Sequence, residues 1–151
     1  MTIIVDGDGC AGRNIIEKVA VKHKIPLRIF CDFNHVITSD YAEVIIMESG
    51  FQSVDMRIAN EATLGDIVVT QDYGVAAMVL GKRAKAISPK GYIFSEDNMD
   101  KLLFERHISA KVRRSGGRTS NPKKRTKEDN DRLEYNLEKL IGSNITQTGM
   151  K

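Results

Sequence analysis

The sequence has no apolar run of membrane-spanning length and no recognisable targeting leader. A transmembrane helix needs about 20 consecutive apolar residues, and no segment of this chain approaches that length. Met1 and Thr2 lead directly into an apolar segment, without the basic stretch that opens a secretory signal. These two absences predict a cytoplasmic protein that is not held in a membrane.

Cysteine is also scarce, because it occurs only at Cys10 and Cys31. The two residues do not form a CxxC motif, and no histidine stands near them at the spacing of a zinc site. We therefore expect two free thiols and no structural zinc.

The chain has 151 residues, of which 41% are hydrophobic and 28% are charged. This length and composition are those of one ordinary domain with a hydrophobic core. We place the domain at residues 1–141 and expect residues 142–151 to form a disordered tail.

The net charge of +3 conceals a basic segment at residues 111–127. The segment has eight basic residues and no acid, so the rest of the chain has a net charge of −5. A cluster of this density suits a polyanion such as nucleic acid, and it is equally typical of a solvated, mobile loop. The candidates for contact with nucleic acid are Arg113, Arg114, Arg118, Lys123, Lys124 and Arg125.

Apolar periodicity predicts strands that alternate with helices over the first ninety residues. Strands are expected at 3–5, 27–31, 42–47, 67–70 and 84–87. Helices are expected at 12–23, 51–62, 73–83, 95–114 and 128–141. This order predicts a three-layer α/β/α fold, in which a mostly parallel sheet of about five strands is covered on both faces and a helical extension follows.

Four aspartates have strand-end or helix-start positions in this scheme. Asp6 and Asp8 follow the first strand, Asp72 follows the fourth, and Asp55 opens a helix. If the fourth strand returns beside the first, Asp6, Asp8 and Asp72 meet at the point where the strand order reverses. The segment 32–35 is expected at the same edge. Asp8 as a helix cap and Asp6 in a turn would explain the first pair equally well.

Converging carboxylates repel one another, by roughly 4 kcal/mol for a pair 4 Å apart at an effective dielectric constant of about 20. A hard cation removes that repulsion, and oxygen-only ligands favour Mg²⁺ or Mn²⁺. The four aspartates therefore predict a metal site for phosphoryl or phosphodiester chemistry. Thr70 and Asp66, at the two ends of the fourth strand, are supporting candidates.

Several motifs in the chain resemble those of the bacterial YaiI/YqxD family. They are Val-Asp-Gly-Asp-Gly-Cys at 5–10, Gly-Phe-Gln-Ser-Val-Asp-Met-Arg-Ile at 50–58, Gly-Asp-Ile-Val-Val-Thr-Gln-Asp at 65–72, Pro-Lys-Gly at 89–91, Arg106 and Arg-Arg-Ser-Gly-Gly at 113–117. The family is uncharacterised and is similar to PIN-domain nucleases, whose acids bind Mg²⁺ or Mn²⁺ and hydrolyse RNA or other nucleic acids. The resemblance implies a PIN-like fold, a preference for RNA over DNA, and catalytic, metal-binding roles for Asp6, Asp8, Asp55 and Asp72.

The chain departs from the usual family pattern at two places. Gly7 and Gly9 stand where the family usually has alanine, and Ala11 replaces its usual proline, which alters the turn and keeps both acids. Met56 replaces a second acid after Asp55, so the implied metal site has one ligand fewer than in many relatives.

Two alternatives remain open. Asp6-Gly-Asp8-Gly-Cys10 resembles the Asp-x-Asp-Gly-Thr motif of haloacid-dehalogenase-type phosphatases, in which the first aspartate attacks phosphorus. Cys10 replaces the threonine of that motif. The other alternative is a nucleic-acid-binding protein without catalysis, which would use mainly the 111–127 segment.

Overall fold

A computed structural model of the chain describes residues 1–7, 10–33, 36–47, 54–99 and 124–149, and it describes side chains as far as residue 143. The predictions made for Asp8, for the helix beyond residue 99 and for residues 111–123 fall outside these ranges.

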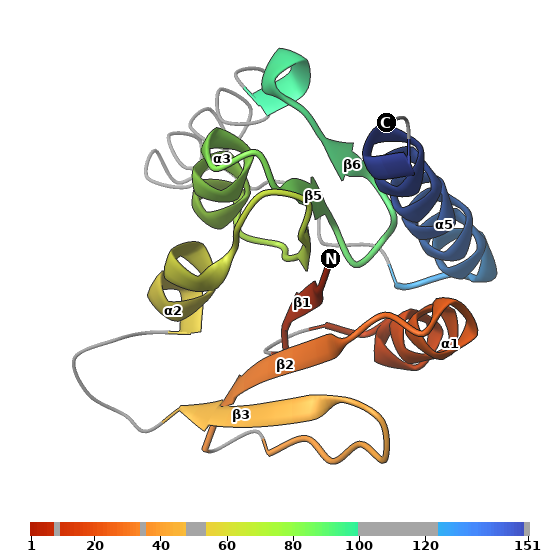
Figure 1. Cartoon of the computed structure of the whole chain (residues 1–151). Helices are drawn as coiled ribbons and strands as arrows, with labels where there is room; N and C mark the ends of the chain where they lie inside the picture. The colour runs from red at the N-terminus through yellow and green to blue at the C-terminus, as the bar shows by residue number, and fades with distance from the viewer. Residues whose placement is uncertain (8–9, 34–35, 48–53, 100–123, 150–151) are drawn as a thin grey trace, which may run out of the picture.

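The described residues form one six-strand sheet in the order β3-β2-β1-β4-β5-β6 (Figure 1). Its strands are β1 (Ile3–Asp6), β2 (Leu27–Asp32), β3 (Glu43–Met47), β4 (Ile67–Val69), β5 (Lys85–Ile87) and β6 (Ile93–Phe94). All pairs are parallel except β5 with β6. The mostly parallel sheet is confirmed, whereas β6 was not predicted because two residues are too few to show a strand periodicity.

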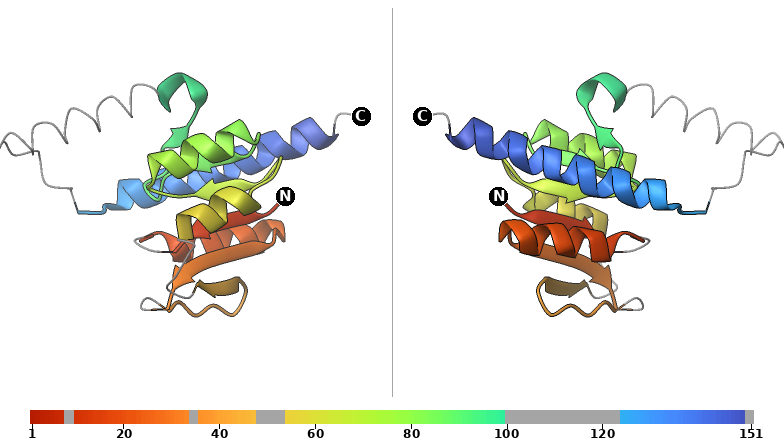
Figure 2. Two further views of the ribbon diagram at one scale, coloured as in Figure 1. Left: turned by 90° about the vertical axis from the view of Figure 1, so that its left-hand side faces the viewer. Right: turned by 90° about the vertical axis from the view of Figure 1, so that its right-hand side faces the viewer.

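Helices cover both faces of the sheet, as a three-layer fold requires. One face carries α1 (Arg13–His23) and α5 (Lys127–Gly149), and the other carries α2 (Val54–Glu61) and α3 (Tyr73–Gly81). Figure 2 shows α2 and α3 in front of the sheet from one side, and α1 and α5 in front of it from the other. Residues 96–99 are also helical.

The strands form two cores because successive side chains point to opposite faces. Ile3 and Val5 of β1 belong to the core under α1 and α5, and Ile4 belongs to the core under α2 and α3. All three residues are at most 2% exposed. Burial on both faces explains why the strand sequences are continuous apolar runs rather than alternating ones.

The crossover from β2 to β3 contains no helix in its described part. Ile37 lies in this connection and is buried in the core on the α1 side. The Tyr41 hydroxyl donates a hydrogen bond to the carbonyl of Ile25 over 2.7 Å. These two side chains hold an irregular segment across the sheet, so that β3 can pair in parallel with β2.

The C-terminal helix is longer than the sequence predicted. It begins with a reciprocal cap, in which the Thr126 amide donates to Asp129 Oδ2 and the Asp129 amide donates to Thr126 Oγ1. It continues to Gly149, so the predicted helix end at residue 141 is wrong. Gly142 is an unfavourable helix residue by about 1 kcal/mol, but it does not stop a helix as proline does.

Among the described residues, no helix is both long and apolar enough to cross a membrane.

The α5 helix is attached to the loop between β5 and β6 through backbone carbonyls. Arg132 Nη1 donates to the carbonyl of Lys90 over 3.1 Å, and Asn136 Nδ2 donates to that of Gly91 over 2.7 Å. Gly91 has a φ of +90°, and a Cβ there would lie 2.4 Å from the Leu133 nitrogen. The loop therefore needs glycine both for its conformation and for the close approach of α5.

We predict that Gly91→Ala destabilises the chain by more than the 1–2 kcal/mol that a left-handed conformation costs an alanine. The added methyl group must also displace the backbone of α5. Urea denaturation followed by circular dichroism measures the difference. Gly142→Ala is the matched control, because no atom lies within 4 Å of a Cβ there. Equal stability of the two variants would contradict the packing described for Gly91.

Ion pairs connect α1 with α5 along their exposed sides. Lys18 Nζ lies 2.9 Å from Glu134 Oε1, and Lys22 Nζ lies 3.0 Å from Glu138 Oε1. His23 Nε2 also lies 2.9 Å from Glu138 Oε1. The hydrogen bonds from His23 and Lys22 hold the pKa of Glu138 below its ordinary value of 4.5.

A lowered carboxyl pKa stabilises the folded chain above the unfolded value, and that stability is lost as the pH falls through the folded value. We therefore expect the free energy of unfolding to fall more steeply between about pH 5 and pH 3 in the unmodified chain than in Glu138→Gln. Urea denaturation at several pH values provides the comparison. Glu128→Gln, at an exposed position of α5, should keep the steep profile.

Candidate functional site

Asp6 ends β1 at the point where the strand order reverses. β1 pairs with β2 on one side and with β4 on the other. The carboxyl ends of these three strands share one edge of the sheet, which we call the carboxyl edge. Asp6 is half-buried there, and its Oδ1 atom is shielded from solvent. The predicted switch point is therefore present, with Asp6 at it.

Thr70 connects Asp6 to the segment that follows β4. Its side chain is fully buried. The Thr70 hydroxyl accepts a hydrogen bond from the Asp72 amide over 3.0 Å and donates one to Asp6 Oδ2 over 3.5 Å. A hydroxyl has only one proton, so when its oxygen accepts a hydrogen bond from an amide, that proton is donated to a different group. Thr70 thus orders the Asp6 carboxylate relative to Asp72, although the two acids are far apart in sequence.

Asp72 caps the first turn of α3. Its Oδ1 accepts hydrogen bonds from the amides of Gly74 over 2.7 Å and of Val75 over 3.1 Å. The sequence analysis considered such a cap for Asp8 and not for Asp72. Both cap bonds use Oδ1, so the carboxylate is held in one orientation.

Two further acids lie at the carboxyl edge. Asp55 is half-buried in the first turn of α2, a helix that packs on β1 and β2. Asp32 is the half-buried last residue of β2. The sequence analysis did not count Asp32 among the ligands, although its strand-end position is the same signal that identified Asp6 and Asp72.

Asp66 does not belong to this group. It precedes β4 and therefore lies at the opposite edge of the parallel sheet from Thr70. Its Oδ1 accepts from the Thr2 amide, and its Oδ2 accepts from the amide and the hydroxyl of Thr63, all within 3.1 Å. The supporting role predicted for Asp66 is wrong, because its carboxylate fixes the turn that enters β4.

Arg125 makes two hydrogen bonds within the fold. Its Nη1 donates to the carbonyl of Pro89 over 2.7 Å, and its Nε donates to Asn130 Oδ1 over 2.6 Å. The same guanidinium packs on Gly12, where a Cβ would lie 2.7 Å from Nη2. Two of its donors are thus used within the fold, and the nucleic-acid role of Arg125 stays a prediction. Lys124 is exposed, and the other four basic candidates lie outside the described residues.

Cys10 lies in the loop after β1 and is only 5% exposed. Burial raises the pKa of its thiol. A buried thiol with a raised pKa is a poor nucleophile and a poor metal ligand at neutral pH, in agreement with the free cysteine predicted there.

Within the described ranges, no group of three or more histidine, cysteine, aspartate or glutamate side chains is arranged to hold a metal ion. Asp8, one of the four predicted metal ligands, lies outside those ranges. What the structure brings together is the pair of Asp6 and Thr70 with the amide of Asp72.

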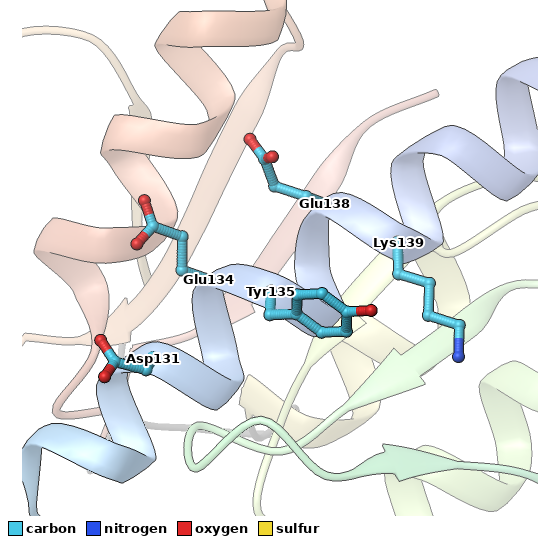
Figure 3. Close-up of a pocket in the computed structure, with 5 residues that line it drawn as sticks. All are labelled: Asp131, Glu134, Tyr135, Glu138 and Lys139. Carbon is cyan, nitrogen blue, oxygen red and sulfur yellow. The ribbon is translucent and has the colours of Figure 1, made fainter.

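An open groove of about 550 Å³ lies along α5, away from these acids (Figure 3). It is lined by Asp131, Glu134, Tyr135, Glu138 and Lys139. Glu134 and Glu138 point towards α1, where they are paired with its lysines. The groove lacks convergent groups for catalysis, so the carboxyl edge remains the candidate site.

Comparison with known proteins gives the family. The family described as "Uncharacterized BCR, YaiI/YqxD family" matches residues 4–143. The chain belongs to the YaiI/YqxD family. It is 64% identical over 141 residues to a UPF0178 protein of Clostridium novyi, an alignment that covers 93% of this chain and 95% of the relative. A UPF0178 protein of Clostridium acetobutylicum is 46% identical over 143 residues, covering 93% and 97%.

Among solved structures, the chain is similar to Rae1 (YacP) from Bacillus subtilis. The sequence identity is 18% and the TM-score is 0.46, over 99% of this chain and 95% of the other. The architecture described above rests on the strand order of the chain itself and not on this likeness.

Gly7 stands where the backbone has no room for a side chain. A Cβ at Gly7 would lie 2.7 Å from Ile37 Cδ1 and 2.9 Å from the carbonyl oxygen of Phe30. The Gly7 amide donates to that same carbonyl over 2.8 Å. Glycine therefore allows β2 and the crossover segment to close tightly on the residue after Asp6.

We predict that Thr70→Val lowers the free energy of unfolding by about 1–3 kcal/mol, because the Asp72 amide loses its acceptor at a site closed to water. Valine keeps the volume of threonine and removes only the hydroxyl. Thr70→Ser keeps the hydroxyl and should retain that hydrogen bond. Urea denaturation distinguishes the two variants, and a fully stable Thr70→Val would show that the hydroxyl does not order this edge.

Proposed function

We propose that the chain is a metal-dependent phosphodiesterase of the nuclease type, acting on nucleic acid and on RNA in preference to DNA. The observation that supports it most directly is the hydrogen-bonded connection from the Asp72 amide through Thr70 to Asp6. It ties the Asp6 carboxylate to the backbone of Asp72, a residue of a separate segment, at the switch point of a parallel sheet, where α/β proteins bind their ligands. The family resemblance adds the PIN-like comparison and the substrate class.

The donor chemistry at this edge fits Mg²⁺ or Mn²⁺. The side chains of Asp6, Thr70 and Asp72 offer only oxygen, which hard divalent cations prefer. Asp6 and Asp72 would hold the ion, with Asp8 and Asp55 completing the set. When bound, such a cation activates water and neutralises charge that develops on phosphate.

The residues of the chain contribute orientation. Two amides at the start of α3 hold the Asp72 carboxylate, and the Thr70 hydroxyl donates a hydrogen bond to Asp6. Preset carboxylates do not have to reorganise when a charged ligand arrives, which is the main electrostatic advantage of an enzyme site. Basic residues of the 111–127 segment would attract the phosphate backbone without reading its sequence.

We expect Asp6→Asn and Asp72→Asn each to lower Mn²⁺-dependent cleavage of single-stranded RNA by at least a hundredfold. Asparagine caps a helix about as well as aspartate, so Asp72→Asn should stay folded and lose only its charge. Cleavage of a labelled oligonucleotide and calorimetric titration with Mn²⁺ measure the two effects. Asp131→Asn, an exposed acid of α5, is the matched control and should behave as the unmodified chain.

The alternatives give different results in the same experiments. Full cleavage by both Asn variants would remove the proposal. A phosphatase with an aspartate nucleophile would form a phosphoryl bond to Asp6 on a monoester substrate, which mass spectrometry detects. A protein that only binds nucleic acid would show salt-dependent RNA binding in every variant and no cleavage.

A further inference from the structure

The outward side of α5 carries a row of three exposed residues. Asp131, Tyr135 and Lys139 are all exposed, and Tyr135 is 72% exposed. They follow one another at intervals of four residues, so they form one ridge along the helix surface. The other side of the helix is buried in the core through Leu133 and Leu137. We call Asp131, Tyr135 and Lys139 the α5 ridge.

The α5 ridge runs along the open groove of about 550 Å³ (Figure 3). Asp131 lies at one end of the groove and Lys139 at the other, with Tyr135 between them. The two glutamates that complete the lining are paired with lysines of α1. Within the described part of the chain, no ion pair involves Asp131 or Lys139. The groove therefore offers a negative end, an aromatic middle and a positive end.

This order of groups is complementary to itself when it is reversed. A two-fold axis sets the same surface of two copies face to face, so that every contact is made twice. If two α5 helices meet antiparallel at Tyr135, each Asp131 faces Lys139 of the other copy. Rows of residues spaced by four pack together at a crossing angle of about 50°, the commonest arrangement of helices in globular proteins. The α5 ridge thus has both the charges and the spacing to pair with itself.

A nucleic acid fits this groove less well than a second copy of the chain. The lining contains three acids and one lysine, so its charge repels phosphate. The single lysine lies at the end of the groove opposite Asp131, where a reversed copy places an acid.

We propose that the groove along α5 is a self-association surface, on which a second copy of the chain packs antiparallel with its own α5 ridge. Tyr135 stacks on Tyr135 of the other copy, and Asp131 pairs with Lys139 at both ends. One helix crossing buries less than the roughly 800 Å² per partner of a standard interface, so the dimer is reversible and concentration-dependent. The inference goes beyond the proposed function, because the groove lies away from the acids of the carboxyl edge.

Charge exchange between the two ends of the α5 ridge tests the pairing. Lys139→Asp sets two acids opposite each other at both ends, and Asp131→Lys sets two lysines there. In low-salt buffer, each variant should weaken the dimer at least about tenfold in sedimentation velocity, since two attractive pairs become repulsive. Asp131→Lys combined with Lys139→Asp restores opposite charges and should restore the dimer. Asp40→Lys, at an exposed position before β3, is the matched control.

A cysteine at the centre of the α5 ridge tests the two-fold axis directly. Tyr135→Cys should form a disulfide-linked dimer when copper phenanthroline is added as oxidant, because the two copies of residue 135 face each other. Cys10 and Cys31 are buried and should not cross-link. Asp40→Cys is the control and should stay monomeric on a non-reducing gel.

The outcomes separate this proposal from the nuclease. An unmodified chain that stays monomeric up to millimolar concentration overturns self-association, as does a dimer that single charge reversals leave intact or that the double variant fails to restore. Equal cross-linking of the two cysteine variants also overturns it. A chain that dimerises as described and never cleaves RNA supports self-association and removes the nuclease, whereas a monomeric chain that cleaves RNA does the reverse.

Discussion

The architecture depends on the parallel pairing of β1 with both β2 and β4. Ile3 is in register with Leu27 on one side and with Ile67 on the other, so the chain builds outward to β3 and must then return to the centre. That return places the carboxyl ends of β1 and β4 side by side. Asp6 and Thr70 meet for this reason, although 64 residues separate them. The acids at the carboxyl edge are thus a consequence of strand order rather than of a local motif.

The C-terminal helix is part of this arrangement rather than an extension of it. Arg125, just before the helix, and Arg132 and Asn136 within it bind the carbonyls of residues 89–91, the loop that leaves β5 at the carboxyl edge. Arg125 also packs on Gly12, at the start of α1. The helix therefore joins the loops that follow β1 and β5, one on each side of β4. The family match, which extends to residue 143, agrees with a helix that the domain requires.

The features that could be predicted from the sequence are those set by patterns of neighbouring residues. Strands β1 to β5 are runs of β-branched and apolar residues, and the acids after β1 and β4 have recognisable positions. Contacts between distant segments were not predictable: nothing in a basic segment shows that Arg125 donates to a carbonyl 36 residues earlier. The role of Asp66 could have been excluded, because a residue before a parallel strand lies at the opposite edge. Asp32 could have been included by the same reasoning.

The carboxyl edge gathers acids from separate segments of the chain. On the side of β4 and α3, the polar groups of Asp6, Thr70 and Asp72 are ordered by hydrogen bonds. On the side of β2 and α2, the acids are Asp32 and Asp55, and both are half-buried. Acids therefore lie on both sides of β1 at this edge, as the repulsion expected between converging carboxylates assumes.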